Sequence, residues 1–196
     1  MCTTTVTYPV TSYDGFAPQQ IDTYTGNQNT QHVMKPSSSE TLTESYQYNA
    51  DGFRSQVTDA RGNTSTFCYD VDYTGASIAG SLGNLTRTIS PPASGGSPLV
   101  TLVKYDNKNN VVETVLPKGV NNGGGVTCST NLSGAVNGSG LYVTDLTYDS
   151  TLGTELLSVT RKYDDPDKGG QTATTQFAYG DAANPGLVTS VTSPRG

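Results

Sequence analysis

The sequence predicts an all-β fold of consecutive antiparallel β-hairpins, and three observations lead to this class. With 22 Gly and 10 Pro among 196 residues, the composition favours short strands joined by tight turns. The aromatic residues are 12 Tyr and 4 Phe, and many tyrosines alternate with polar neighbours, as in half-buried strands. Turn pairs such as Asp-Gly recur between these stretches. Hydrophobic residues make up only 33% of the chain, which would also fit disorder, but this periodic patterning argues against it.

One complete unit of the pattern lies between residues 45 and 70. Residues 46–48 alternate aromatic and polar, and residues 49–52 (Asn-Ala-Asp-Gly) form a strong hairpin signal because Asp and Gly tolerate positive φ. Residues 53–57 then place Phe, Ser and Val on one face of a strand. A second turn at 59–63 leads into a strand over 64–69 that is rich in Thr and aromatic residues.

The unit recurs along the chain as Tyr followed by Asp, Asn or Gly. Each pair is expected to end a strand, with the Tyr packed on the sheet and the next residue bonding the backbone of its own turn. The second strand of a unit carries an apolar residue four positions before Val or Ile, and it ends at Gly- or Pro-containing turns. The residues that define the repeat are Tyr48, Gly52, Gly62, Tyr69, Asp70, Tyr105, Asp106, Gly119, Tyr148, Asp149, Tyr163, Asp164 and Tyr179.

The domain organisation predicted from this pattern has two parts. Residues 1–44 are an irregular or degenerate lead-in, in which Tyr13-Asp14-Gly15-Phe16 resembles the later Asp-Gly-Phe turn. Residues 45–196 are the hairpin array, with loop insertions near 72–83, 93–98 and 121–140. The last insertion contains Gly123-Gly124-Gly125 and is expected to be a mobile surface loop.

These residues resemble the RHS/YD-repeat family, with the best matches at 48–62, 105–119 and 179–196. The resemblance implies a curved sheet that forms part of a hollow shell, as in Tc toxin B and C components, RHS polymorphic toxins, wall-associated contact toxins and teneurins. In bacterial members the shell encloses a C-terminal toxin. The acidic autoprotease motif of the family's C-terminal core is not found here, so no catalytic residue is carried over. The resemblance also implies that the chain is part of a longer protein.

The charge and the distribution of apolar residues argue against two kinds of partner. A net charge of −6 from 14% charged residues, without a basic cluster, argues against nucleic acid, and no apolar run is long enough for membrane insertion. The expected partners are further repeats of the parent protein, self-assembly, or an enclosed polypeptide cargo. The family resemblance implies a secreted or cell-surface protein, although this chain shows no export signal.

The chain has three cysteines, Cys2, Cys68 and Cys128. The favoured prediction is that they are free thiols, and the alternative is a Cys68–Cys128 bridge.

The sequence predicts no catalytic, cofactor or metal site, and no enzyme. His32 is the only histidine and is expected in a polar loop, which excludes multi-histidine sites. Asp164, Asp165 and Asp167 form the one acidic cluster, but they lack the spacing of a calcium loop. We therefore expect a structural segment of a shell that encloses, displays or delivers another polypeptide. The alternative is an extracellular adhesin that binds carbohydrate or a partner through exposed tyrosines.

Overall fold

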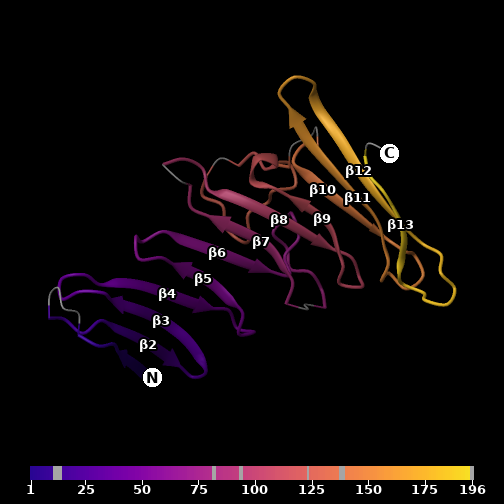
Figure 1. The fold of residues 1–196 in the computed structure, drawn as a ribbon. Coiled ribbons are helices and arrows are strands. Elements are labelled where there is room, and N and C mark those ends of the chain that lie inside the picture. Colours follow the sequence, from indigo (N-terminus) through magenta and orange to yellow (C-terminus); the bar gives the residue numbers. More distant parts are fainter. Residues whose placement is uncertain (11–14, 81–82, 93–94, 123, 137–139, 195–196) are drawn as a thin grey trace. The chain divides into compact units, whose positions relative to one another are not determined.

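In a computed structural model, the chain is described over residues 1–10, 15–80, 83–92, 95–122, 124–136 and 140–194. Within these ranges thirteen strands follow one another in chain order in one open antiparallel sheet, and the one helical element is a single 3₁₀ turn (Figure 1). The all-β class of consecutive hairpins is confirmed. No helix in the described residues is long and apolar enough to cross a membrane. The chain divides into two compact units, residues 1–67 and 68–196.

The first unit is a series of hairpins whose described residues include none that is buried. Residues 1–44, expected to be irregular or degenerate, contain three regular strands and the start of a fourth. The expected turn at Tyr13-Asp14 lies outside the described residues. The regularity arises because Gly26 adopts positive φ (61°) in a two-residue turn and Thr and Gln fill the strands on either side. The strands are β1 (Cys2–Thr7), β2 (Gln19–Thr25), β3 (Gln28–Lys35), β4 (Leu42–Tyr48) and β5 (Arg54–Thr58), and β6 (Thr64–Tyr69) begins here.

The second unit contains the two longest strands, of 10 and 11 residues, and the 3₁₀ turn. Pro117 begins that turn after β9 because its fixed φ suits the first helical position. The elements are β7 (Leu85–Ser90), β8 (Leu99–Tyr105), β9 (Val111–Val115), η1 (Pro117–Gly119), β10 (Val143–Tyr148), β11 (Leu156–Asp165), β12 (Gly169–Tyr179) and β13 (Val188–Thr192).

A hydrophobic core lies on one face of β7–β10. The strand registers bring its members into rows that cross the sheet, since paired residues of neighbouring strands point to the same face. Complete burial of one such aliphatic side chain contributes about 1.5–3 kcal/mol. The paired core residues are Ile89 with Val100, Leu102 with Val115, and Val115 with Val143.

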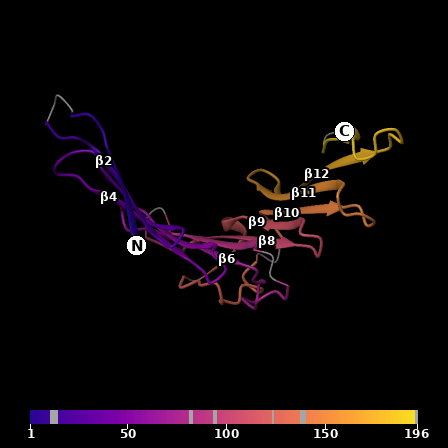
Figure 2. The ribbon, with the colours of Figure 1, turned by 90° about the horizontal axis from the view of Figure 1, so that it is seen from below.

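Two of the predicted insertions cover this face. Figure 2 shows the segments after β6 and after β9 on the same side of β8. From the first, Val71 and Tyr73 pack against the core, and from the second come Val126, Cys128 and Leu132, of which Leu132 is 2% exposed. The second insertion therefore does not lie wholly at the surface, because Val126, Cys128 and Leu132 pack against the core, and its mobility stays a prediction. Residues 81–82, 93–94, 123 and 137–139 of the three insertions lie outside the described residues.

Candidate functional site

Five of the repeat tyrosines occupy the same place in the fold. Each is the last residue of an even-numbered strand, β4, β6, β8, β10 or β12, and each is half-buried. Tyr24 lies one residue before the end of β2, so a sixth tyrosine comes close to the pattern. The five are Tyr48, Tyr69, Tyr105, Tyr148 and Tyr179.

The hydroxyl groups of three of these tyrosines join neighbouring strands. Tyr48 Oη donates to the carbonyl of Asn29 at the start of β3 (2.7 Å). In the second unit, Tyr105 donates to the Leu85 carbonyl at the start of β7 (3.3 Å), and Tyr179 donates to the Leu156 carbonyl at the start of β11 (3.0 Å). In all three cases the ring crosses from the end of one strand to the beginning of the preceding one. The tyrosine thus acts as a clasp between two strands and pairs its polar atom while its ring packs.

The residue after Tyr48 and Tyr105 builds a five-residue turn with its side-chain oxygen. Asn49 Oδ1 accepts the backbone N–H groups of Asp51 (3.1 Å) and Phe53 (2.8 Å). Asp106 Oδ1 accepts those of Lys108 (2.9 Å) and Asn110 (2.8 Å) in the same way. The turns that start at Asp59 and Asp72 repeat the arrangement. Hairpins in both units therefore have turns with the same hydrogen bonds from backbone N–H groups to an Asn or Asp side-chain oxygen.

The fourth position of these turns requires positive φ. Gly52 (87°), Gly62 (82°) and Gly75 (82°) occupy it in three turns, and Asn109 (72°) occupies it in the fourth. Only Gly, and less easily Asn or Asp, adopts this region at low cost. Gly119 has a different role: it is buried in η1, and a Cβ there would come within 2.8 Å of the Leu141 carbonyl oxygen.

The turn hydrogen bonds also stabilise the charged form of the carboxylates. The Asn63 side chain and backbone N–H lower the pKa of Asp59, and the Thr74 hydroxyl does most to lower that of Asp72. Partial burial acts to raise the pKa of Asp106, but hydrogen bonds from Asn110 and Lys108 bring it below the usual value. Asp149 accepts backbone N–H groups from Leu152, Thr154 and Glu155 in a longer turn, and these lower its pKa strongly.

Asp70, Tyr163 and Asp164 do not follow the shared pattern. Asp70 is buried (7% exposed), and its carboxylate accepts the N–H groups of Gly83 and Asn84 across the insertion rather than within a short turn. Tyr163 lies within β11 and is 41% exposed. The turn that follows is built by Asp165, whose carboxylate accepts the Asp167 and Lys168 N–H groups. The structure thus gives Tyr163 and Asp164 a different place from the other Tyr-Asp pairs.

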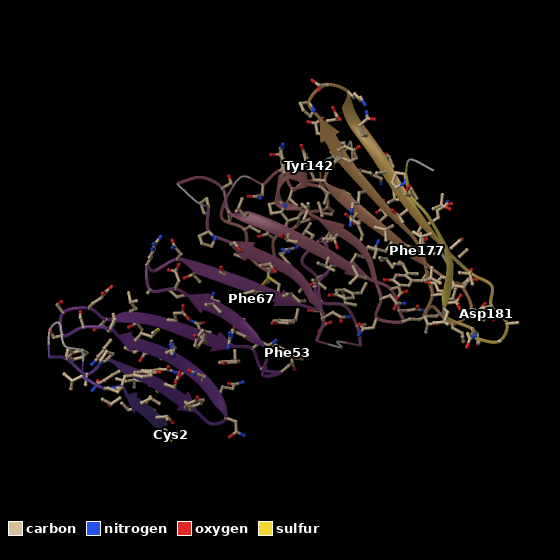
Figure 3. All side chains as sticks on the ribbon, viewed as in Figure 1. Cys2, Phe53, Phe67, Tyr142, Phe177 and Asp181 are labelled. Atoms are coloured by element: carbon tan, nitrogen blue, oxygen red, sulfur yellow. A yellow bond between two sulfur atoms is a disulfide. The ribbon has the colours of Figure 1, made fainter. Side chains whose placement is uncertain are left out.

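Cys68 and Cys128 form a disulfide, with Cα atoms 5.4 Å apart, so the prediction of free thiols is wrong for this pair. Cys2 is free and exposed. Figure 3 shows the sulfur atoms in yellow near the labelled Phe67, which precedes Cys68. The bond joins the end of β6 to the second insertion over 60 residues of sequence, a separation that no local pattern encodes.

The side chain of Arg87, in β7, binds the backbone of the same insertion. Its side chain is 1% exposed, and Nη1 donates to the carbonyls of Thr127 (2.7 Å), Cys128 (3.1 Å) and Thr130 (3.0 Å). Burial lowers the pKa of Arg87, opposed by the charge of Asp72. Sequence reasoning missed this residue because a single Arg in a strand of mixed polarity carries no distinguishing signal.

His32 and the acidic residues 164, 165 and 167 are the ones that were considered for catalysis or metal binding. His32 lies in β3 rather than in a loop, and its Nδ1 is 2.8 Å from the Asp22 carboxylate. Hydrogen bonds from His32 and Gln20 lower the pKa of Asp22. Among the residues that the structure describes, no group of three His, Cys, Asp or Glu side chains is placed to hold a metal ion. Asp164, Asp165 and Asp167 are among these described residues.

Comparison with known proteins gives a likeness of fold. No protein-family model matches the sequence, and no curated protein matches it. The chain is similar to part of the crystal structure of TcdB2-TccC3-Cdc42, with a TM-score of 0.57 and 14% sequence identity. The match covers 91% of this chain but only 8% of the solved one. At this identity the likeness concerns the fold alone: nearly all of this all-β sheet resembles a small part of a much larger chain.

Proposed function

We propose that this chain is a structural segment of an RHS/YD-repeat shell or scaffold that encloses, displays or delivers another polypeptide. The observation that carries the proposal is the sheet itself, in which each strand pairs with the next along the chain. Such a wall satisfies backbone hydrogen bonds through neighbouring strands and can extend by repetition. Its action would be to separate an enclosed polypeptide from the surroundings.

The roles of the repeat residues support this proposal. Three tyrosine hydroxyls bond backbone carbonyls, and all five strand-end tyrosines are half-buried. An adhesin that bound its target through a tyrosine row would need these side chains to be accessible. The Asx side chains are likewise occupied by turn N–H groups. Both repeat features are thus engaged in holding hairpins together, and we expect no catalytic activity.

The fold likeness to TcdB2-TccC3-Cdc42 supports the same class of protein. Together with the repeated Tyr-Asp turns, it favours membership of the RHS/YD family and a toxin as one class of cargo. The partners would be further repeats or a second copy of the chain, in addition to the cargo. The location would be extracellular or at the cell surface, and neither nucleic acid nor membrane insertion has a part in this function.

Electron microscopy of native particles that contain this chain tests the proposal, with X-ray scattering of the isolated chain alongside. A compact globule of this length has a radius of gyration of about 16 Å. We expect a larger value for the isolated chain, and particles in which the chain is part of a wall around a hollow. A compact monomer found alone in native material would contradict the scaffold and favour the adhesin.

A further inference from the structure

We propose that the Cys68–Cys128 disulfide is a redox switch, whose reduction by a small thiol frees the second insertion from the core of the second unit. The bond joins the end of β6 to the middle of that insertion, whose Val126, Cys128 and Leu132 pack against the core. Among the residues that the structure describes, it is the one disulfide. While the bond is intact, the Cα atoms of Cys68 and Cys128 stay 5.4 Å apart, so this part of the insertion cannot leave the sheet.

The two cysteines differ in their access to solvent. Cys68 is 2% exposed, whereas Cys128 is half-buried and lies between the exposed residues Thr127 and Ser129. Access decides in part which sulfur of a disulfide a thiol attacks. A thiol in solution therefore reaches the bond from the side of Cys128.

The reduction proceeds by two exchanges. A thiolate attacks the Cys128 sulfur, the bond between the two cysteine sulfurs breaks, and Cys68 leaves as a thiolate that takes up a proton. A second thiolate then attacks the reductant's own sulfur in the mixed disulfide and frees Cys128. Two molecules of the reductant end as one disulfide, and the two electrons that they give up reduce the protein bond.

The other described attachments of the insertion are noncovalent and can break and re-form. Arg87 Nη1 donates to three of its backbone carbonyls, and the Leu132 N–H donates to the Tyr73 carbonyl (2.7 Å). Leu132 is the one buried residue of the described segment 124–136. A segment with few buried contacts opens locally at low cost once nothing covalent holds it. Reduction therefore turns a fixed cover into one that opens and closes.

Limited proteolysis of the whole chain in glutathione buffers tests the switch, with Cys2→Ser to remove the free thiol. Alkylation and mass spectrometry give the reduced fraction, and thermolysin cleavage before Leu132 reports release, because this side chain must leave the core to be cut. We expect cleavage to rise about tenfold in the reduced protein, in proportion to the reduced fraction, since the open state gains entropy without the cross-link. Hydrogen exchange of β11 and β12 should stay unchanged, because none of their described residues belongs to the core.

Replacement of Arg87 separates the covalent attachment from the noncovalent one. Arg87→Met should change cleavage at Leu132 little in the oxidised protein, where the bond holds the insertion, and should raise it further in the reduced protein. Arg161→Met, at an exposed arginine of β11, is the matched control and should leave both rates unchanged.

Equal cleavage of the oxidised and reduced proteins would overturn the proposal. So would a bond that no glutathione ratio reduces in the folded chain. Loss of exchange protection in β11 and β12 on reduction would overturn it as well, since the bond would then hold the whole unit together rather than one cover. The scaffold function needs no such switch, so either result leaves it standing.

Discussion

Residues 1–67 and residues 68–196 use the same hairpins and the same turns but differ in how they are stabilised. Both contain five-residue turns built by Asn or Asp, and both contain a tyrosine clasp between strands. The described residues of the first unit include none that is buried, whereas the second has a core around Val100, Leu102 and Val115, each with 0% exposure. A disulfide and a buried arginine hold its covering segment in place.

The two units share the repeat but differ in how much apolar surface they bury. Turns, clasps and paired strands are sufficient to specify hairpins, but they bury little apolar surface, which is the main source of folding free energy. In the second unit, insertions that depart from the repeat cover strand residues such as Val100, Leu102 and Val115, and these form the core. We infer that the stability of the second unit depends on this covering, and that the repeat supplies geometry.

The largest effect is expected from loss of the disulfide. The bond closes 60 residues of sequence, so its removal should lower the free energy of unfolding of the second unit by about 4 kcal/mol. Denaturant unfolding of Cys68→Ala/Cys128→Ala, followed by circular dichroism, would measure this. The reference protein would carry Cys2→Ser, which removes the free thiol. Unchanged stability would show that the insertion stays in place without the covalent link.

Replacement of Arg87 is expected to have the next largest effect. Arg87→Met keeps most of the volume but leaves the carbonyls of Thr127, Cys128 and Thr130 without their donor. Hydrogen bonds to a charged group contribute more than neutral ones, so we expect a loss of about 2–4 kcal/mol. Thermal unfolding of both Arg87→Met and Arg87→Lys is the measurement, and Lys should recover part of the loss. If Arg87→Met is as stable as the unmodified chain, apolar packing alone holds the insertion over the core.

The tyrosine clasps should contribute less, and similarly in both units. Tyr48→Phe and Tyr179→Phe each remove one hydroxyl-to-carbonyl bond and should cost about 1 kcal/mol. Tyr163→Phe is the matched control, because this tyrosine lies at 41% exposure within β11. Equal effects in all three variants would mean that the clasp bonds add nothing specific.

The smallest effect on stability is expected from a fall in pH. Asp59 in the first unit and Asp72 in the second have pKa values lowered by turn hydrogen bonds. A carboxyl group with a lower pKa in the folded state stabilises the fold above its unfolded pKa of about 3.9, and this contribution is lost as the pH falls through the folded value. We expect the first unit to open earlier on acidification, since none of its described residues is buried.

Limited proteolysis between pH 5 and pH 2 would compare Asp59→Asn with the unmodified chain. Asn49 builds the same turn with an amide oxygen, so Asp59→Asn should keep the fold and weaken the pH dependence. Equal acid sensitivity of both proteins would exclude the turn carboxylate as the cause.

The hairpins were predictable from sequence because their determinants are local. Gly52 and Gly62 fix turns through positive φ, and Tyr48 and Tyr105 fix strand ends within a few residues of the turns that follow. The same local logic failed at Tyr163, where the Tyr-Asp pair is present but β11 continues to Asp165. A two-residue pattern cannot by itself determine where a strand ends.

The covering of the core by the second insertion was not predictable, because its determinants are distant in sequence. Cys128 and Leu132 stand in a Gly-, Ser- and Thr-rich segment whose composition is typical of a loop. Their packing against β7–β9 depends on contacts about 40 residues distant in sequence, such as that of Arg87 with Thr127. His32 shows a similar limit: polar neighbours indicated a loop, yet strand pairing with β2 and β4 places it in β3.

Native-state hydrogen exchange, read by mass spectrometry segment by segment, tests the contrast between the two units most directly. Exchange protection reports the local free energy of opening, which follows buried contacts. We predict strong protection of β7, β8 and β9 and weak protection of β1–β5, with the protection of β7–β9 reduced on treatment with a thiol reductant. Equal protection in the two units, unchanged by reduction, would contradict the account that the covered face is what stabilises this sheet.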